Sequence, residues 1–127
     1  VQNIDHAATF LQLAGVEIPE DIQGESYLSL LKGEKPKDWR KSLYYHFYEY
    51  PGEHAVKRHY GIRTERYKLI HFYHDIDAWE LYDLQEDPSE MDNIYGDEKY
   101  ADLVDSLKVE LRKLQEQYDD PIAQKYE

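Results

Sequence analysis

The sequence predicts an α+β fold in which a four-stranded antiparallel sheet packs against one long C-terminal helix. The first observation is the tract from His59 to Leu84, where short runs rich in Tyr, Ile, Phe and Leu alternate with polar breaks, as in a β-meander. The second is an aromatic stretch at 42–50 that alternates at period two. The third is a stripe of apolar residues at helical spacing between Asp97 and Tyr118.

The first element along the chain is a short helix. Apolar residues recur at helical spacing from Val1 to Leu11, and Gly15 is placed to end the helix. Asn3 or Asp5 is expected to cap its start. Because the pattern is already present at Val1, we expect the helix to begin before that residue.

The following stretch, residues 16–40, is expected to be a connector outside the core. It contains a single helical turn around residues 27–31 and four residues that interrupt regular structure, namely Pro19, Gly24, Gly33 and Pro36.

Strands are expected at 42–50, 59–64, 67–74 and 79–84. In the third of these, alternation places Tyr67, Leu69, His71 and Tyr73 on one face and Lys68, Ile70, Phe72 and His74 on the other. Both faces therefore carry bulky groups and both require a cover. The C-terminal helix can cover one face, and the lack of a second cover suggests that the chain is part of a larger assembly.

After the last strand, Asp87 to Glu90 has the pattern of a helix start, with Asp87 as N-cap and Glu90 reaching back in a capping box. We expect this turn to end at Tyr95-Gly96. A helix of about six turns is then expected at 97–118, and its stripe consists of Tyr100, Leu103, Val104, Leu107, Leu111, Leu114 and Tyr118. The residues after Pro121 are expected to fray.

Composition excludes several classes of function. The net charge of −12 argues against a nucleic-acid binder, which needs basic surface for the phosphate backbone. The sequence contains no apolar run of the length that a membrane span requires. It contains no Cys, which excludes disulfides, thiolate metal sites and a Cys nucleophile.

The charges are segregated along the chain. Residues 54–74 carry a net charge of +4, with the His counted as neutral, whereas residues 75–105 carry −11. Two explanations remain open. The basic residues either pair internally with the acidic half, or they hold an anionic ligand at one edge of the sheet.

The histidines do not indicate a metal site. His71 and His74 lie three residues apart on a strand and therefore point to opposite faces. His54 and His59 flank a loop and could converge, but no carboxylate cluster accompanies them. His46 is expected to be a packed aromatic residue that bonds a tyrosine hydroxyl. With no Ser-His-Asp pattern and no glycine-rich phosphate loop, the chain shows no assembled active site.

Several linked motifs identify a family resemblance. In order, these are NIDHAATFLQLAGVEIPEDIQGESYLSLLKGE, an aromatic strand, HYGIRTERYKLIHFY and WELYDLQEDPSEMDNIYG. This series resembles the C-terminal part of the arylsulfatase-like hydrolases, in the branch that acts on sulfated glycans. Two positions depart from the family pattern: Ala8 and Ser29 stand where a Pro is usual.

The resemblance implies a parent enzyme with formylglycine and calcium, neither of which this chain supplies. The family nucleophile is a Cys or Ser two residues before a Pro, and the residues at that distance here are all acidic: Glu17, Glu34, Glu49, Glu86 and Asp119. The pairs Asp5-His6 and Asp92-Asn93 look like pieces of the calcium site, but the first opens a helix and the second lies in the D-P-x-E segment. We therefore expect no catalytic residue, no metal and no cofactor in this chain.

The resemblance further implies two parts in the chain. Residues 1–41 are expected to belong to the end of a missing N-terminal catalytic domain, and residues 42–127 to form the sheet-plus-helix domain. The expected function is to complete a sulfatase, a sulfuric ester hydrolase of sulfated glycans, in a periplasmic, secreted or lysosomal location, with the 127-residue chain inactive alone. The alternative is a stand-alone module that binds glycans or proteins without catalysis.

The candidate binding residues lie in the loop from Glu53 to His59, outside the predicted sheet. In the parent enzyme this loop is expected to form one wall of the substrate cleft. Lys57 and Arg58 would meet sulfate or uronate charge, and His54 or His59 would donate to a sugar hydroxyl.

Overall fold

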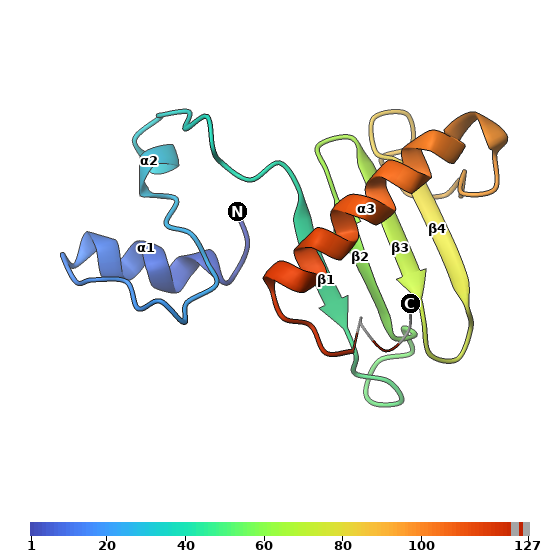
Figure 1. Ribbon diagram of the computed structural model, residues 1–127, viewed down its shortest axis with the longest axis horizontal. Helices are drawn as coiled ribbons and strands as arrows, with labels where there is room; N and C mark the ends of the chain where they lie inside the picture. Colours follow the sequence, from blue (N-terminus) through green and yellow to red (C-terminus); the bar gives the residue numbers. More distant parts are fainter. Residues whose placement is uncertain (123–124, 126–127) are drawn as a thin grey trace. The chain divides into compact units, whose positions relative to one another are not determined.

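The computed structural model describes residues 1–122 and Lys125. The chain divides into two compact units, Val1–Arg40 and Lys41–Glu127, next to the predicted division after residue 41. The first unit contains α1 (Asp5–Leu13) and α2 (Leu28–Leu31). The second contains β1 (Leu43–Phe47), β2 (His59–Arg63), β3 (Tyr67–Phe72), β4 (Ala78–Asp83), the 3₁₀ turn η1 (Glu98–Tyr100) and α3 (Ala101–Gln117) (Figure 1).

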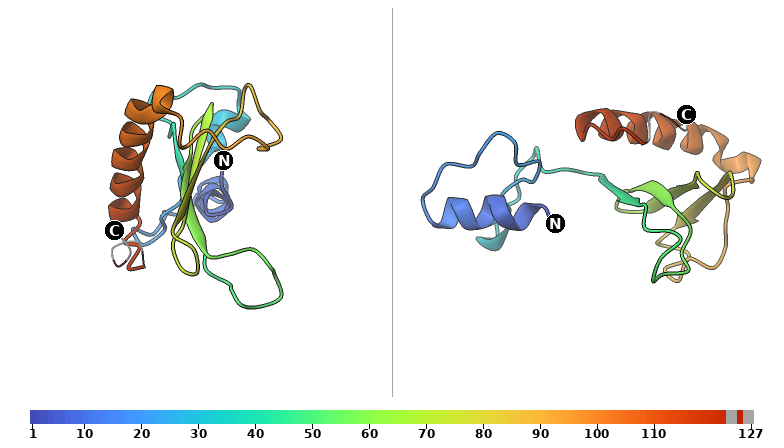
Figure 2. Two further views of the ribbon diagram at one scale, coloured as in Figure 1. Left: turned by 90° about the vertical axis from the view of Figure 1, so that its right-hand side faces the viewer. Right: turned by 90° about the horizontal axis from the view of Figure 1, so that it is seen from below.

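The second unit is the predicted α+β domain. Its strands are antiparallel and follow the order β1-β2-β3-β4, so each strand pairs with its neighbour in the sequence. The helix α3 runs along one face of this sheet, which Figure 2 shows edge-on in its left view. We call this the helix face of the sheet, and the opposite one the second face.

The core lies between α3 and the helix face. From the helix it receives the predicted stripe, of which Val104, Leu107, Leu111 and Leu114 are buried. The sheet contributes Tyr60, Ile62, Leu69, Tyr73 and Leu81. Alternation along β3 thus grouped these side chains correctly, because Leu69 and Tyr73 both lie in the core beneath the helix. At β1 the same rule directs Tyr44 toward the core and Tyr45 to the second face.

Some boundaries differ from the sequence expectations. The first helix begins at Asp5 rather than before Val1, and neither Asn3 nor Asp5 caps it, since the cap residue is Ile4 without a side-chain bond. The first strand ends at Phe47, because β2 starts at His59 and offers no partner to the residues beyond. The expected frayed tail after Pro121 lies largely outside the described residues.

The expected helical turn at Asp87–Tyr95 is wrong. The Asp87 carboxylate accepts the backbone N–H groups of Met91 and Asp92, at 2.7 and 2.8 Å, which folds a loop rather than a helix. Glu90 adopts a φ of 54° and does not reach back to Asp87. A side-chain cap does occur at Asp97, whose carboxylate accepts the N–H of Lys99 at the start of η1.

The connector in the first unit folds back on α1 rather than acting as a tether. The side chain of Asp5 is fully buried and bonds Arg40 Nη2 at 2.7 Å and the backbone N–H of Glu25 at 3.0 Å. Gly24 passes so close to α1 that a Cβ there would lie 2.0 Å from the Ile4 carbonyl oxygen. Burial raises the pKa of Asp5, but the bonds from backbone N–H groups and Arg40 outweigh it and hold that pKa below its usual value.

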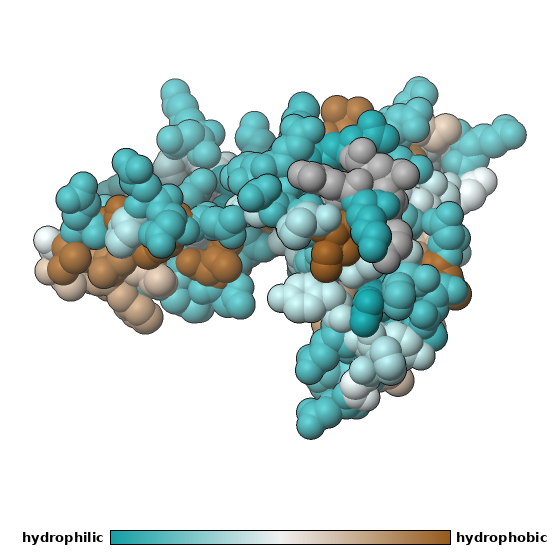
Figure 3. All heavy atoms as spheres, turned by 60° about the horizontal axis from the view of Figure 1, so that its bottom comes forward, coloured by the Kyte–Doolittle hydropathy of each residue, from teal (hydrophilic) through white to brown (hydrophobic). Residues whose placement is uncertain are grey.

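The first unit also presents apolar surface. Phe10, Leu13 and Val16 are exposed along and just beyond α1, and Figure 3 shows brown, hydrophobic surface on this part of the molecule. In the described part of the chain, the helices are too short or too polar to cross a membrane.

Candidate functional site

The loop between β1 and β2 carries the predicted binding residues and lies at one end of the sheet. His54, Lys57 and Arg58 belong to this loop, whereas His59 is the first residue of β2. The turn between β3 and β4 emerges at the same end, because Phe72 pairs with His59 in register. The structure therefore brings the basic loop and Asp75 together.

Lys57 is held by partners within the domain. Its ammonium donates to the Asp75 carboxylate at 2.6 Å and to the Tyr50 hydroxyl at 2.8 Å, and it lies 4.2 Å from the Tyr50 ring centroid. The Asp75 bond raises the pKa of Lys57, and the reciprocal bond lowers the pKa of Asp75. The side chains remain about one-third exposed, so water screens this pair.

His59 packs in the sheet instead of standing in the loop. Its ring stacks on Phe47 at 5.6 Å and lies 5.2 Å from Phe72. Its Nδ1 bonds the Lys57 carbonyl oxygen at 2.8 Å. His59 therefore fixes the backbone beside Lys57 as well as filling the second face.

Arg58 and His54 are the predicted residues least committed to internal bonds. The Nε atom of Arg58 is buried without a hydrogen-bond partner, and its charge helps to lower the pKa of Asp75. His54 is exposed, with its ring 6.2 Å from that of Phe47. A buried donor without a partner is costly, which marks Arg58 as a group suited to an additional acceptor.

Two other ion pairs favour internal pairing for much of the basic tract. Besides Lys57–Asp75, Lys68 pairs with Glu90, and Arg66 makes a bidentate pair with Asp83 at 2.7–3.1 Å. All three carboxylates belong to the acidic half of the chain. Through this pair, Arg66 neutralises a carboxylate whose side chain is only 5% exposed.

The histidines behave as packed or bonded side chains. His46 bonds the Tyr73 hydroxyl through Nε2 at 2.8 Å, as predicted, and its Nδ1 meets Asp120. His71 is buried on the helix face, while His74 is exposed beyond the end of β3. Within residues 1–122 and Lys125, no group of three or more acidic, His or Cys side chains could hold a metal ion.

The second face of the sheet is lined by large side chains. It presents Tyr45, Phe47, His59, Ile70, Phe72 and Tyr82, and α3 lies on the opposite side. The Tyr45 side chain lies on Gly61, where a Cβ would come within 2.5 Å of the Tyr45 hydroxyl oxygen and 2.7 Å of its ring carbon Cζ. The hydroxyl of Tyr45 is buried without a hydrogen-bond partner. Burial raises the pKa of this hydroxyl, and the carboxylates of Glu90 and Glu80 raise it further.

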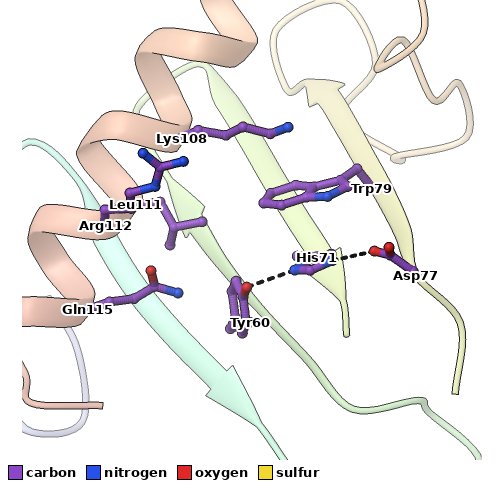
Figure 4. A pocket seen from close by; sticks show the side chains of 8 residues that line it. All are labelled: Tyr60, His71, Asp77, Trp79, Lys108, Leu111, Arg112 and Gln115. Carbon is purple, nitrogen blue, oxygen red and sulfur yellow. Dashed lines mark hydrogen bonds and ion pairs between the residues drawn. The ribbon is translucent and has the colours of Figure 1, made fainter. Parts of the chain in front are cut away.

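A pocket of about 320 Å³ lies on the helix face, between α3 and the β3–β4 hairpin (Figure 4). Lys108 and Arg112 line the pocket from α3. Neither residue was identified from the sequence as part of a site. Their spacing of four residues beside the apolar stripe is the signal that could have revealed them. Trp79 and His71 meet in it because they are paired across β3 and β4.

These features define a class of protein: a small α+β domain with a helix on one face of its sheet and no assembled catalytic centre in its described residues. A family model described as "N-sulphoglucosamine sulphohydrolase, C-terminal" matches residues 1–117. The chain belongs to this family, as the sequence motifs indicated.

Relatives and solved structures agree with this assignment. The chain is 58% identical to an N-acetylglucosamine-6-O-sulfatase of Bacteroides thetaiotaomicron, over 93% of this chain and 22% of that protein. It is 35% identical to a multifunctional alkaline phosphatase superfamily protein of Trinickia caryophylli, over 81% of this chain and 22% of the relative. A structure solved with its substrate D-glucosamine-2-N,6-O-disulfate superposes with a TM-score of 0.88 and 56% identity, over 92% of this chain and 24% of the other.

The predicted fold is therefore confirmed: the four-stranded antiparallel sheet and the C-terminal helix match the C-terminal region of a sulfatase structure. The chain spans about a fifth to a quarter of the length of the relatives and the solved structure named above.

Proposed function

We propose that this chain completes a sulfatase that removes sulfate from sulfated glycans. The observation that carries the proposal is the family match over residues 1–117, together with a relative whose name specifies a sulfated amino sugar. The chain would act as the C-terminal domain of a polypeptide several times its length.

The catalytic chemistry would come from elsewhere in that polypeptide. Formylglycine would be formed from a Cys or Ser, and the chain contains neither a Cys nor a Ser with the required Pro and Arg spacing. The described residues also lack a cluster of metal ligands suitable for calcium. These residues therefore do not fit either group, and no step of the reaction is assigned to them.

The second face of the sheet would dock against the preceding catalytic domain. Phe47 and Phe72 are only partly buried on this face, so a partner that removes them from water would lower the free energy of the assembly. The buried Tyr45 hydroxyl lacks a partner within the described residues, and a docked surface could supply one. The exposed apolar side chains of α1, including Phe10 and Leu13, would be covered in the same assembly.

The loop 53–59 would form one wall of the substrate cleft. Arg58 would bind a sulfate or uronate through its guanidinium, and the exposed His54 would donate to a sugar hydroxyl. Lys57 already forms an ion pair with Asp75, so it would interact with the substrate while keeping this bond. The role of His59 would be to hold the loop backbone at Lys57.

One observation favours a second candidate, a phosphoester hydrolase. The second relative is described as an alkaline phosphatase superfamily protein, so this domain also occurs outside enzymes named as sulfatases. The higher identity to the N-acetylglucosamine-6-O-sulfatase favours the sulfatase. Relative turnover of matched aryl sulfate and aryl phosphate esters by the complete polypeptide separates the two.

The test of the cleft wall compares Arg58→Ala with Arg63→Ala in the complete polypeptide that contains this chain. Arg63 is an exposed cation at the other end of β2, which makes it a matched control. We expect Arg58→Ala to lower kcat/KM for a sulfated oligosaccharide by about ten- to a hundredfold, because one charge-assisted hydrogen bond is lost.

The same variant should leave kcat/KM for a small aryl sulfate nearly unchanged, because that substrate does not reach the loop. Equal losses on both substrates would mean that the loop supports the catalytic centre or the fold. If the variant lost activity on neither substrate, the basic residues of the loop would pair only with carboxylates of the same domain and would not bind the substrate.

A further inference from the structure

Tyr50 and Lys57 form a hydrogen-bonded pair within the loop between β1 and β2. The Lys57 ammonium donates to the Tyr50 hydroxyl oxygen at 2.8 Å and lies 4.2 Å from the centroid of the Tyr50 ring. The Asp75 carboxylate accepts a second bond from the same ammonium at 2.6 Å. The pair therefore brings Tyr50, which the sequence placed at the end of the first strand, into the candidate binding loop.

Each member of this pair keeps one hydrogen-bond donor. A lysine ammonium has three N–H groups, and two of those of Lys57 are used by Asp75 and Tyr50. The Tyr50 hydroxyl accepts from Lys57, and its own proton has no acceptor among the residues that the structure describes. A hydroxyl whose oxygen accepts a bond from a cation is polarised into a stronger donor. The pair thus offers one N–H and one O–H from neighbouring atoms.

The two donors are accessible and are already in position. The Lys57 side chain is 37% exposed, and Tyr50 is half-buried. Donor atoms 2.8 Å apart can bond the same acceptor oxygen or two oxygens of one oxyanion group. The backbone of Lys57 is fixed as well, because His59 Nδ1 bonds its carbonyl oxygen. This arrangement exists before a ligand arrives, which reduces the entropy that binding would cost.

An ionised oxygen is the acceptor that suits this pair best. A charged N–H makes its shortest and strongest bonds with ionised oxygens. Sulfate and carboxylate groups carry such oxygens, and both occur on acidic sugars. Arg58 adds a second positive charge in this region, because its charge helps to lower the pKa of Asp75.

We propose that Tyr50 and Lys57 together bind one oxyanion group, a sulfate or a carboxylate, of an acidic sugar. Asp75 is then a positioning residue, which holds the Lys57 ammonium without touching the ligand. Tyr50 joins the binding residues of the loop 53–59 through its hydroxyl. The inference rests on the proposed function, in which this loop forms one wall of the substrate cleft.

The experiment is a calorimetric titration of the complete polypeptide that contains this chain. The probes are chitotetraose carrying 6-sulfonate groups that cannot be hydrolysed, an unsulfated tetrasaccharide of alternating N-acetylglucosamine and glucuronate, and neutral chitotetraose. At least one acidic probe should bind with a Kd about tenfold or more below that of the neutral probe. The two acidic probes distinguish a sulfate site from a carboxylate site. Sulfate release from a 6-sulfate ester is assayed separately, so binding without release would contradict the proposed function and not this inference.

Tyr50→Phe and Tyr48→Phe form a matched pair, because each removes one tyrosine hydroxyl from the same stretch and Tyr48 is 63% exposed. Of the two hydroxyls, only that of Tyr50 bonds Lys57. Phenylalanine keeps the ring that lies against the ammonium, so the thermal unfolding midpoint should stay nearly unchanged. Tyr50→Phe should weaken binding of the acidic probe by about tenfold, whereas Tyr48→Phe should change it by less than about twofold.

Asp75→Asn tests the positioning role without altering Tyr50. It should weaken binding of the acidic probe by about threefold or more, because the Lys57 ammonium loses the charged acceptor that holds it. Asp75→Glu should restore part of the affinity. Glu65→Gln is the control for charge, since it removes one exposed negative charge from the turn between β2 and β3, at the opposite end of the sheet.

Four results would overturn the proposal: no binding of either acidic probe, equal binding of the neutral probe, equal effects of Tyr50→Phe and Tyr48→Phe, or unchanged or tighter binding after Asp75→Asn. Tighter binding in the last case would mean that Asp75 competes with the ligand for Lys57 instead of holding it.

Discussion

Replacement of Leu107 by Ala tests whether α3 is the structural cover of the sheet. Leu107 is 6% exposed and belongs to the core between α3 and the helix face. The substitution removes apolar groups worth about 2 kcal/mol of transfer free energy, at about 0.8 kcal/mol for each methylene, and leaves a cavity that adds to the loss. We expect the free energy of unfolding to fall by about 2 to 5 kcal/mol.

A loss of this size is a large fraction of the stability of a small domain, which is typically about 5 to 15 kcal/mol. Urea unfolding followed by far-UV circular dichroism measures it, and the midpoint should fall by about 1 M or more. Val109→Ala is the control, because Val109 lies on the same helix and is 50% exposed. Its free energy of unfolding should change by less than about 0.5 kcal/mol. An unchanged midpoint for Leu107→Ala would show that α3 is not docked on the sheet.

Two further predictions concern ion pairs. Arg40→Met should destabilise the first unit by about 3 to 5 kcal/mol, because the fully buried Asp5 carboxylate loses its counter-charge. Hydrogen exchange of the α1 amides should become faster in this variant, and an unchanged exchange rate would contradict the prediction. The hydrogen bonds from Arg66 hold the pKa of Asp83 below its usual value in the folded protein. The charged carboxylate therefore stabilises the fold above about pH 3.9, the pKa of Asp in an unfolded chain, and this stabilisation is lost as the pH falls through the lower pKa of Asp83 in the folded state. Asp83→Asn should therefore flatten the dependence of stability on pH below about pH 4 in urea titrations, and a pH profile as steep as that of the unsubstituted chain would refute this role.

The sheet and its helix could be predicted because their signals are local and repeated. Alternation along β3 grouped Leu69 and Tyr73 on one face of the sheet, and the stripe on α3 identified Leu107 and Leu111 as buried. These patterns persist over many residues, so errors at single positions do not change the fold. The Asp87–Glu90 segment shows the converse. An N-cap and an Asx-type loop use the same carboxylate bond to a backbone N–H, so the local sequence could not distinguish them.

The parts of the candidate sites that escaped prediction depend on contacts between distant residues. Asp5 was read as a possible cap because its partner Arg40 lies 35 positions further on. The basic tract left two explanations open, and only the strand register showed that Arg66 reaches Asp83. Predicting the pocket on the helix face would have required both the strand register and the position of α3 on the sheet. Whether Arg58 and His54 contact a substrate stays a prediction.

The strictly sequential strand order has a consequence for the kinetics of folding. Each pairing in the sheet closes a short loop, with only residues 64–66 between β2 and β3, so these hairpins can form with little loss of chain entropy. The helix that completes the core is the last element and must return to the first strands, where Ser42 bonds Glu110 across 68 positions. We therefore expect a rate-limiting step in which α3 condenses on a preformed meander, and pulse-labelled hydrogen exchange should detect protection of β2 and β3 amides before those of α3.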